Sequence, residues 1–144
     1  MRCPCVCGER EAPALAVDVV IEVGSRIVLI KRANPPFAGC WALPGGFVEC
    51  GERVEEAAER EAEEETNLNV EVKELLGVYS DPERDPRGHV VSICFIARGE
   101  GKLKGRSDAA EARLFDPREA LEQSLAFDHA DIIRDYLRRK HVLR

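Results

Sequence analysis

Glutamate side chains crowd one short segment of the chain. Eight of them fall within Glu52–Glu65, a stretch of 14 residues without glycine or proline. This composition predicts a helix over Glu52–Thr66. If Val54 marks its apolar face, Glu61 and Glu65 lie at about −20° and +20° from that direction, given 100° per residue. Both carboxylates are therefore expected to point toward the protein interior.

Inward carboxylates need a neutralising partner. Glu61 and Glu65 are four residues apart on the helix, so they are neighbours and repel each other. Burying either one as a bare ion costs roughly several kcal/mol, unless it is protonated, paired with arginine or bound to a cation. Glu64 lies at the edge of the same face, and three carboxylates suit hard cations such as Mg²⁺ or Mn²⁺. We expect a metal site; the alternative is a charged helix whose inner glutamates pair with arginine.

A glycine-containing turn precedes this helix. In Leu43-Pro44-Gly45-Gly46 the two glycines allow backbone angles closed to other residues and can bring a carbonyl close to a ligand. Turn and helix together read Gly46-x5-Glu52-x7-Arg60-Glu61-Ala62-x-Glu64-Glu65-x-Asn67-Leu68. This pattern resembles the Nudix box, G-x5-E-x7-R-E-U-x-E-E-x-G-U, over 23 residues and at every charged position. Ala62 and Asn67 depart from it, but Asn readily takes the left-handed conformation that ends a helix.

The resemblance implies a fold and a metal site. Members of the Nudix family fold as an α/β/α sandwich with a mixed β-sheet, in which the box forms loop, helix and loop. By this resemblance Mg²⁺ or Mn²⁺ is the cofactor, and it activates a water molecule for attack on a diphosphate. Glu64 would be a further ligand or the catalytic base, beside the metal ligands Gly45 (through its carbonyl), Glu61 and Glu65.

Three more residues receive roles from the resemblance. Glu52 and Arg60 would hold the loop to the helix as an ion pair, because the guanidinium fork suits a carboxylate. Relatives often place an extra catalytic carboxylate in a later loop. We expect Glu111 to be that base or metal contact, and Asp108 lies in the same loop.

Residues outside the box indicate the substrate. Pro82 lies 14 residues beyond Leu68, within Tyr79–Val91 (YSDPERDPRGHVV), and this position is similar to the marker of the ADP-ribose pyrophosphatase subgroup. Leu125–His129 (LAFDH) is also similar. The alternatives are ordinary loop stiffening by proline and exposed, solvated arginines. We expect hydrolysis of ADP-ribose to AMP and ribose 5-phosphate, with substrate contacts from Pro82, Arg84, Arg87 and Phe37; core packing is the expected role of Trp41.

Two other functions stay open. One is a nucleoside triphosphate pyrophosphohydrolase that cleans nucleotide pools, which would release inorganic diphosphate. The other is a non-catalytic nucleotide-sensing module. The intact carboxylates Glu61, Glu64 and Glu65 argue against the second.

Length and composition limit the remaining possibilities. With 144 residues, the chain fits a single domain over residues 1–144. A net charge of −6 argues against long nucleic acid as a partner, which leaves a small-molecule nucleotide. No apolar stretch predicts a membrane span or signal peptide, so we expect a cytoplasmic protein with reduced cysteines. A homodimer is expected by analogy only.

The cysteines fall into two groups. Cys3, Cys5 and Cys7 form a C-x-C-x-C run, whereas zinc sites more often show C-x-x-C pairs. We therefore expect residues 1–12 to form a mobile tail. The other three are expected to be small buried side chains: Cys40, Cys50 and Cys94.

Hydrophobic patterning supplies the elements that must position the helix. Gly24-Ser25 separates two β-branched runs and predicts a hairpin. The order of elements predicts a mixed sheet covered by helices. Expected strands are Ala14–Val23, Arg26–Lys31, Trp41–Leu43, Leu68–Tyr79, His89–Ala97 and Ala112–Phe115, with the loop Asn34–Gly51 around the third. Expected further helices are Pro117–Gln123 and Asp128–Arg139.

Overall fold

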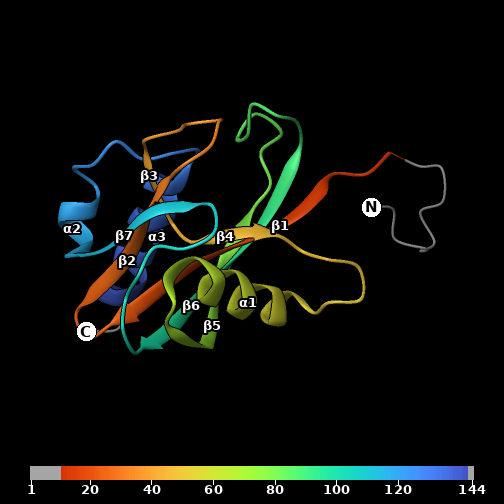
Figure 1. Ribbon diagram of the computed structural model, residues 1–144. Coiled ribbons are helices and arrows are strands. Elements are labelled where there is room, and N and C mark those ends of the chain that lie inside the picture. Colours follow the sequence, from red (N-terminus) through yellow and green to blue (C-terminus); the bar gives the residue numbers. More distant parts are fainter. Residues whose placement is uncertain (1–10, 143–144) are drawn as a thin grey trace.

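The computed structural model describes residues 11–142 (Figure 1). Cys3, Cys5 and Cys7 therefore lie outside the described residues. The strands are β1 (Ala14–Val23), β2 (Arg26–Arg32), β3 (Trp41–Ala42), β4 (Gly45–Phe47), β5 (Asn69–Tyr79), β6 (Val90–Glu100) and β7 (Ala109–Phe115). The helices are α1 (Val54–Thr66), α2 (Pro117–Ala120) and α3 (His129–Val142).

The strands form one mixed sheet. Its order is β3-β2-β1-β6-β5, with β4 also paired to β1 and β7 to β2. The pair β1–β6 is parallel, and the other pairs are antiparallel. The predicted hairpin joins β1 to β2, with Val23 opposite Arg26. The central strand β1 therefore contacts β2, β4 and β6, and it connects most of the sheet.

Helices cover both faces of the sheet, which confirms the expected α/β/α sandwich (Figure 1). Alternate side chains of a strand point to opposite faces. On β1, Val17, Val19 and Ile21 pack with the alanines of α1. Val20 packs on the other face with α3, through Ile132 and Ile133. The small alanine side chains let the α1 backbone approach the sheet closely.

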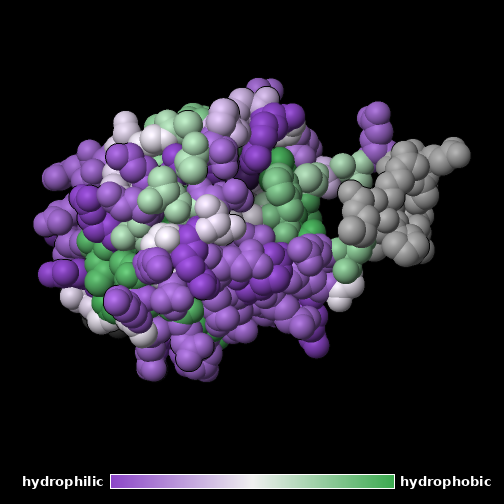
Figure 2. Space-filling view, in the orientation of Figure 1, coloured by the Kyte–Doolittle hydropathy of each residue, from purple (hydrophilic) through white to green (hydrophobic). Residues whose placement is uncertain are grey.

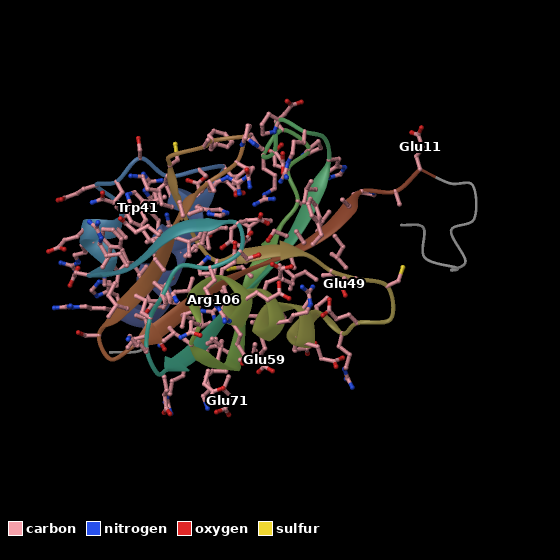
Figure 3. The ribbon with its side chains drawn as sticks, viewed as in Figure 1. Glu11, Trp41, Glu49, Glu59, Glu71 and Arg106 are labelled. Atoms are coloured by element: carbon pink, nitrogen blue, oxygen red, sulfur yellow. The ribbon has the colours of Figure 1, made fainter. Side chains whose placement is uncertain are left out.

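Helix α1 is fixed at both ends. It begins at Val54, two residues after the expected start, and the Arg53 N–H donates to Glu56 Oε1 at 3.0 Å. Asn67 ends the helix in the left-handed conformation, at φ 65°. The loop before β7 covers this end, where the Arg106 guanidinium donates to the Glu63 carbonyl at 3.0 Å (Figure 3). The expected left-handed role of Asn67 is confirmed.

Several boundaries and one strand differ from the expectations. Strand β4 was expected to be a turn, because Gly45 and Gly46 have no side chains from which an alternating pattern can be recognised. Strand β7 begins at Ala109 and α2 ends at Ala120, so the strand is longer and the helix shorter than expected. Cys94 is buried as expected, but Cys40 is half-buried and Cys50 is exposed.

Figure 2 shows a mostly hydrophilic surface over α1 and a hydrophobic area beside the start of β1.

Trp41 is buried and packs edge-on against Phe115 at 5.1 Å, so its expected core role is confirmed. Within residues 11–142 no helix combines the length and apolar character needed to cross a membrane.

Candidate active site

Strand β4 lies between β1 and α1, and its glycines make this position possible. Gly45 pairs with Asp18 of β1. A methyl group on Gly45 would overlap the Val17 carbonyl oxygen, and one on Gly46 would overlap the Glu61 carboxylate. Gly45 therefore excludes any side chain, because it would meet fixed backbone, whereas a side chain at Gly46 would have to displace the movable Glu61 carboxylate. The backbone of β4 thus directly contacts the acidic face of the helix.

Glu65 is the most buried of the three candidate carboxylates on α1. It is 7% exposed, and the Gly45 N–H donates to its Oε1 at 2.8 Å. Burial raises the pKa of Glu65 to about 8, and the nearby charges of Glu61, Asp18 and Asp108 add to this effect. The single hydrogen bond from Gly45 opposes the shift without cancelling it. This group therefore lies where a cation would favour its charged form.

Arg60 organises the outer carboxylates. It donates to both carboxylate oxygens of Glu52, at 2.6 and 3.0 Å, and its guanidinium also reaches the Phe47 carbonyl at 3.2 Å. The expected ion pair is thus present, and it ties α1 to the loop after β4. Arg60 also contacts Glu61 at 2.8 Å, yet burial still raises the pKa of Glu61. Glu64 lies outward, with its side chain 49% exposed.

These side chains suit a hard divalent cation by their chemistry. All are carboxylates, and the pKa values of Glu61 and Glu65 are raised by burial and by neighbouring carboxylates. No three His, Cys, Asp or Glu side chains within residues 11–142 already form an ion site. Glu61 faces Arg60 and Glu65 faces the Gly45 amide, so both would have to turn toward an ion.

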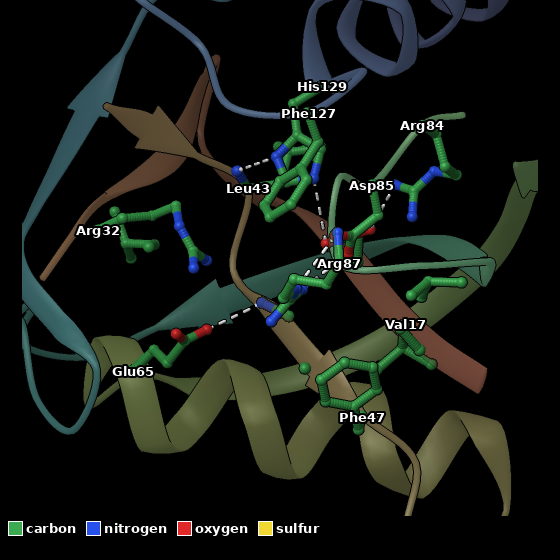
Figure 4. Close-up of a pocket in the computed structure, with 16 residues that line it drawn as sticks. Val17, Arg32, Leu43, Phe47, Glu65, Arg84, Asp85, Arg87, Phe127 and His129 are labelled. Carbon is green, nitrogen blue, oxygen red and sulfur yellow. Dashed lines mark hydrogen bonds and ion pairs between the residues drawn. The ribbon is translucent and has the colours of Figure 1, made fainter. Parts of the chain in front are cut away.

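Two cavities share Glu65 and adjoin there, and Figure 4 shows the inner one. The outer cavity is acidic and contains Glu61, Glu65 and Asp108. The inner cavity contains Asp18, Arg84, Phe127 and His129. Both share the residues Ile30, Arg32, Gly45, Gly46, Phe47, Glu65 and Arg87. We call the two cavities together the cleft.

A buried polar network forms one wall of the inner cavity. Asp18 accepts a hydrogen bond from Ser92, and its Oδ1 lies 3.4 Å from His129 Nε2. The Leu43 N–H donates to His129 Nδ1 at 2.9 Å, which leaves Nε2 as the protonated ring nitrogen. Arg84 adds two bonds to Asp128, at 2.9 and 2.7 Å. The network therefore connects β1, α3 and the segment that leads into Gly45.

Two of the expected substrate residues line the cleft. Arg84 does so, but its side chain is only 4% exposed and already paired, so it is not a solvated loop residue. Arg87 donates two hydrogen bonds to Asp85, at 3.1 and 2.8 Å, and lies near the rings of Phe47 and Phe127. Its position between the two rings allows contact with a ligand.

The structure does not bring four other expected residues, Glu64 among them, into the lining of either cavity. Phe37 contacts Phe127 edge-on at 4.9 Å but lines neither cavity, and Pro82 is an exposed loop residue. Glu111 lies in β7 and not in a loop, because the strand begins earlier than expected. Its carboxylate pairs with Arg113 at 2.8 Å. Asp108 of the same segment lies in the outer cavity instead.

Sequence reasoning missed other residues of the cleft. Asp18 gave a recognisable signal, because it is a charge within the apolar run ALAVDVV. Arg32 ends a strand, and nothing in its local sequence marks it. Phe127 lies in Leu125–His129, a segment that the resemblance indicates without assigning a role to this ring, and its left-handed backbone, at φ 51°, has no sequence signal. Its ring lies 5.0 Å from the Arg32 guanidinium carbon.

Glu65 predicts how stability depends on pH without metal. Its carboxyl titrates near 4.5 when solvated and at about 8 in the folded protein, so the folded state holds an extra proton between these values. In EDTA, stability should fall from pH 4.5 to 8, and Glu65→Gln should remove roughly 2–5 kcal/mol of that fall. Urea unfolding at pH 5 and 8.5 measures it. Glu55→Gln, on the exposed side of α1, should behave like wild type; equal pH dependence in Glu65→Gln would contradict the assignment.

Gly46 predicts a separation between folding and metal binding. The added methyl of Gly46→Ala displaces the Glu61 carboxylate, so Mn²⁺ affinity should fall by about tenfold or more while the melting temperature changes little. Electron paramagnetic resonance of free Mn²⁺ measures the affinity. Gly77→Ala is the matched control, because its new methyl meets only Tyr79, at 3.5 Å. Unchanged Mn²⁺ affinity in Gly46→Ala would argue against Glu61 as a ligand.

Comparisons with known proteins agree with this geometry. The family model of the NUDIX domain matches residues 12–136 of the sequence. An ADP-ribose pyrophosphatase of Methanocaldococcus jannaschii is 60% identical over 130 residues, which cover 90% of this chain and 76% of that protein.

Solved structures show the same fold. A NUDIX hydrolase from Nitrosomonas europaea has a TM-score of 0.82 at 32% identity, covering 92% of this chain and 74% of that one. The NUDIX domain of Shewanella oneidensis NrtR, solved in complex with ADP ribose, has a TM-score of 0.78 at 28% identity and covers 90% and 89%. Gly46, Glu61 and Glu65 of the box line the cleft, and the chain belongs to the Nudix family of hydrolases.

Proposed function

We propose that this protein hydrolyses the diphosphate bond of ADP-ribose, with Mg²⁺ or Mn²⁺, to give AMP and ribose 5-phosphate. The observation that carries the proposal is the position of Glu65 where an acidic outer cavity meets an inner cavity containing arginines and Phe127. The 60% identical relative named as an ADP-ribose pyrophosphatase supports the choice of substrate. So does the related NUDIX domain that binds ADP ribose.

The acidic residues of the cleft and of α1 would have different roles in this reaction. Glu61, Glu65 and the Gly45 carbonyl would hold the metal, which supplies charge neutralisation and an activated water when bound. Glu64 lies at the solvent-exposed rim and would be a further ligand or the base that takes the proton of the water. Arg60 and Glu52 hold the helix against β4. Glu111 is left out, because it is paired with Arg113 outside the cleft.

The inner cavity would bind the organic part of the substrate. Phe127 and Phe47 offer aromatic faces, and Arg87 lies between them, 5.5 and 5.3 Å from the ring centres. Arg84 would act indirectly, because its bonds to Asp128 hold the wall of the cavity. The homodimer and the cytoplasmic location expected from the sequence stay predictions.

Product analysis tests this function. With Mg²⁺ or Mn²⁺, mass spectrometry should find AMP and ribose 5-phosphate from ADP-ribose. Glu65→Gln should reduce kcat by about 100-fold or more, because a buried ligand or base is lost, whereas Glu55→Gln should not. Preferred release of inorganic diphosphate from nucleoside triphosphates would favour the pool-cleaning function instead. Tight ADP-ribose binding without turnover would indicate a sensing module.

A further inference from the structure

Three arginines line the cleft, and two of them are already neutralised. Arg84 has two hydrogen bonds to Asp128 and lies 3.7 Å from Asp18. Arg87 has two bonds to Asp85. Arg32 is different, because it forms no ion pair with any Asp or Glu of residues 11–142.

Neutral groups hold Arg32 in place. Its Nε donates to the Pro36 carbonyl at 2.7 Å, and one terminal nitrogen makes a longer contact with the Asn34 carbonyl, at 3.4 Å. The guanidinium also lies over the Phe127 ring, at 5.0 Å from the centre. These contacts fix the direction of the fork but supply no negative charge.

Among the described residues, Arg32 therefore has no carboxylate within ion-pair distance. Its side chain is half-buried, and burial together with the charge of Arg87 lowers the pKa of Arg32. Two guanidinium groups close together in a cleft repel each other unless an anion lies between them. The carboxylates of Glu65, Asp85 and Asp108 act on Arg32 only from beyond ion-pair distance. A bound anion would relieve the repulsion, accept from the free terminal nitrogen and replace the long contact to Asn34.

Arg32 lies where such an anion would meet the acidic residues. It lines both cavities, as Glu65 does. In Figure 4 the ends of both side chains point into the same pocket, from opposite elements, β2 and α1. An anion held here by Arg32 would also be within the reach of a cation held by Glu61 and Glu65.

We propose that Arg32 binds a phosphate oxygen of the substrate diphosphate and is the main protein cation that does so. A planar guanidinium with one free terminal nitrogen, and a second held only by the 3.4 Å contact to Asn34, suits two phosphate oxygens, which a point charge does not match. This assignment rests on the proposed function in taking a nucleoside diphosphate derivative as the ligand. Arg84 cannot fill this role without breaking its bonds to Asp128, and the charge of Arg87 is already neutralised by Asp85.

Calorimetry with a non-hydrolysable ligand tests the assignment. The α,β-methylene analogue of ADP-ribose keeps the phosphate charges, and Mg²⁺ keeps the acidic site neutralised. Arg32→Gln should weaken its binding by about 10- to 100-fold, and Arg32→Lys should recover only part of the loss. Arg87→Gln should lose less than Arg32→Gln. Arg113→Gln, an exposed arginine outside the cleft, should bind like wild type.

Two further measurements separate phosphate binding from general damage. Adenosine, which has no phosphate, should bind Arg32→Gln and wild type equally, and Mn²⁺ affinity should not change. Wild-type affinity for the analogue in Arg32→Gln, equal loss of adenosine binding, or no measurable binding to the wild type would each overturn the assignment. If ADP-ribose is not hydrolysed but Arg32→Gln still weakens the analogue, the proposed function fails and the role of Arg32 stands.

Discussion

A carboxylate buried beside other carboxylates is the constraint around which this cleft is arranged. Glu65 is nearly inaccessible, receives one hydrogen bond from the Gly45 backbone and lies near Glu61. An uncompensated charge there is costly, so the group either keeps a proton or has a cation beside it. The folded chain leaves this choice open, because the backbone of β4 approaches Glu65 without placing a positive side chain next to it.

The rest of the site keeps that arrangement in position. Gly45 and Gly46 allow β4 to lie between sheet and helix, and Arg60 fastens the helix to the residues that follow. On the other side, His129 and Asp18 hold the segment before Gly45 through the Leu43 amide. Rigid supports of this kind keep Glu61 and Glu65 facing the cleft, whereas a loose loop would let their carboxylates turn toward solvent.

The sequence was most informative where charged residues occupy positions that helical periodicity assigns to the apolar face. The glutamates on the apolar stripe of α1 could be assigned because helical geometry converts residue spacing directly into direction. The hairpin, α1 and its Asn67 cap could be predicted for the same reason: each depends on local sequence. Strand β4 could not, because glycine carries no pattern. Glu111 is predicted to lie in a loop but lies in β7, because the start of β7 depends on pairing with β2, a contact distant in sequence.

The ion pairs of the loop arginines could not be predicted from local sequence either. Arg84 and Arg87 lie in a polar loop that looks solvated, but Asp128 and Asp85 neutralise them. Arg32 ends a strand, and its lack of an ion partner is visible only when the loop from Asn34 to Pro36 and the Phe127 ring are placed around it. The sequence thus identified the acidic half of the cleft and two of its three arginines, but neither Arg32 nor the ion pairs of the other two.

Proton release during metal binding tests the central claim most directly. Because the pKa of Glu65 is about 8 in the protein without metal, this group is largely protonated at pH 7 and must lose its proton to hold a cation. Calorimetric titration with Mn²⁺ in buffers of different ionisation enthalpy counts the protons. We expect close to one proton per protein at pH 7, much less at pH 9, and almost none from Glu65→Gln. Binding without proton release at pH 7, or equal release from Glu65→Gln, would contradict the account.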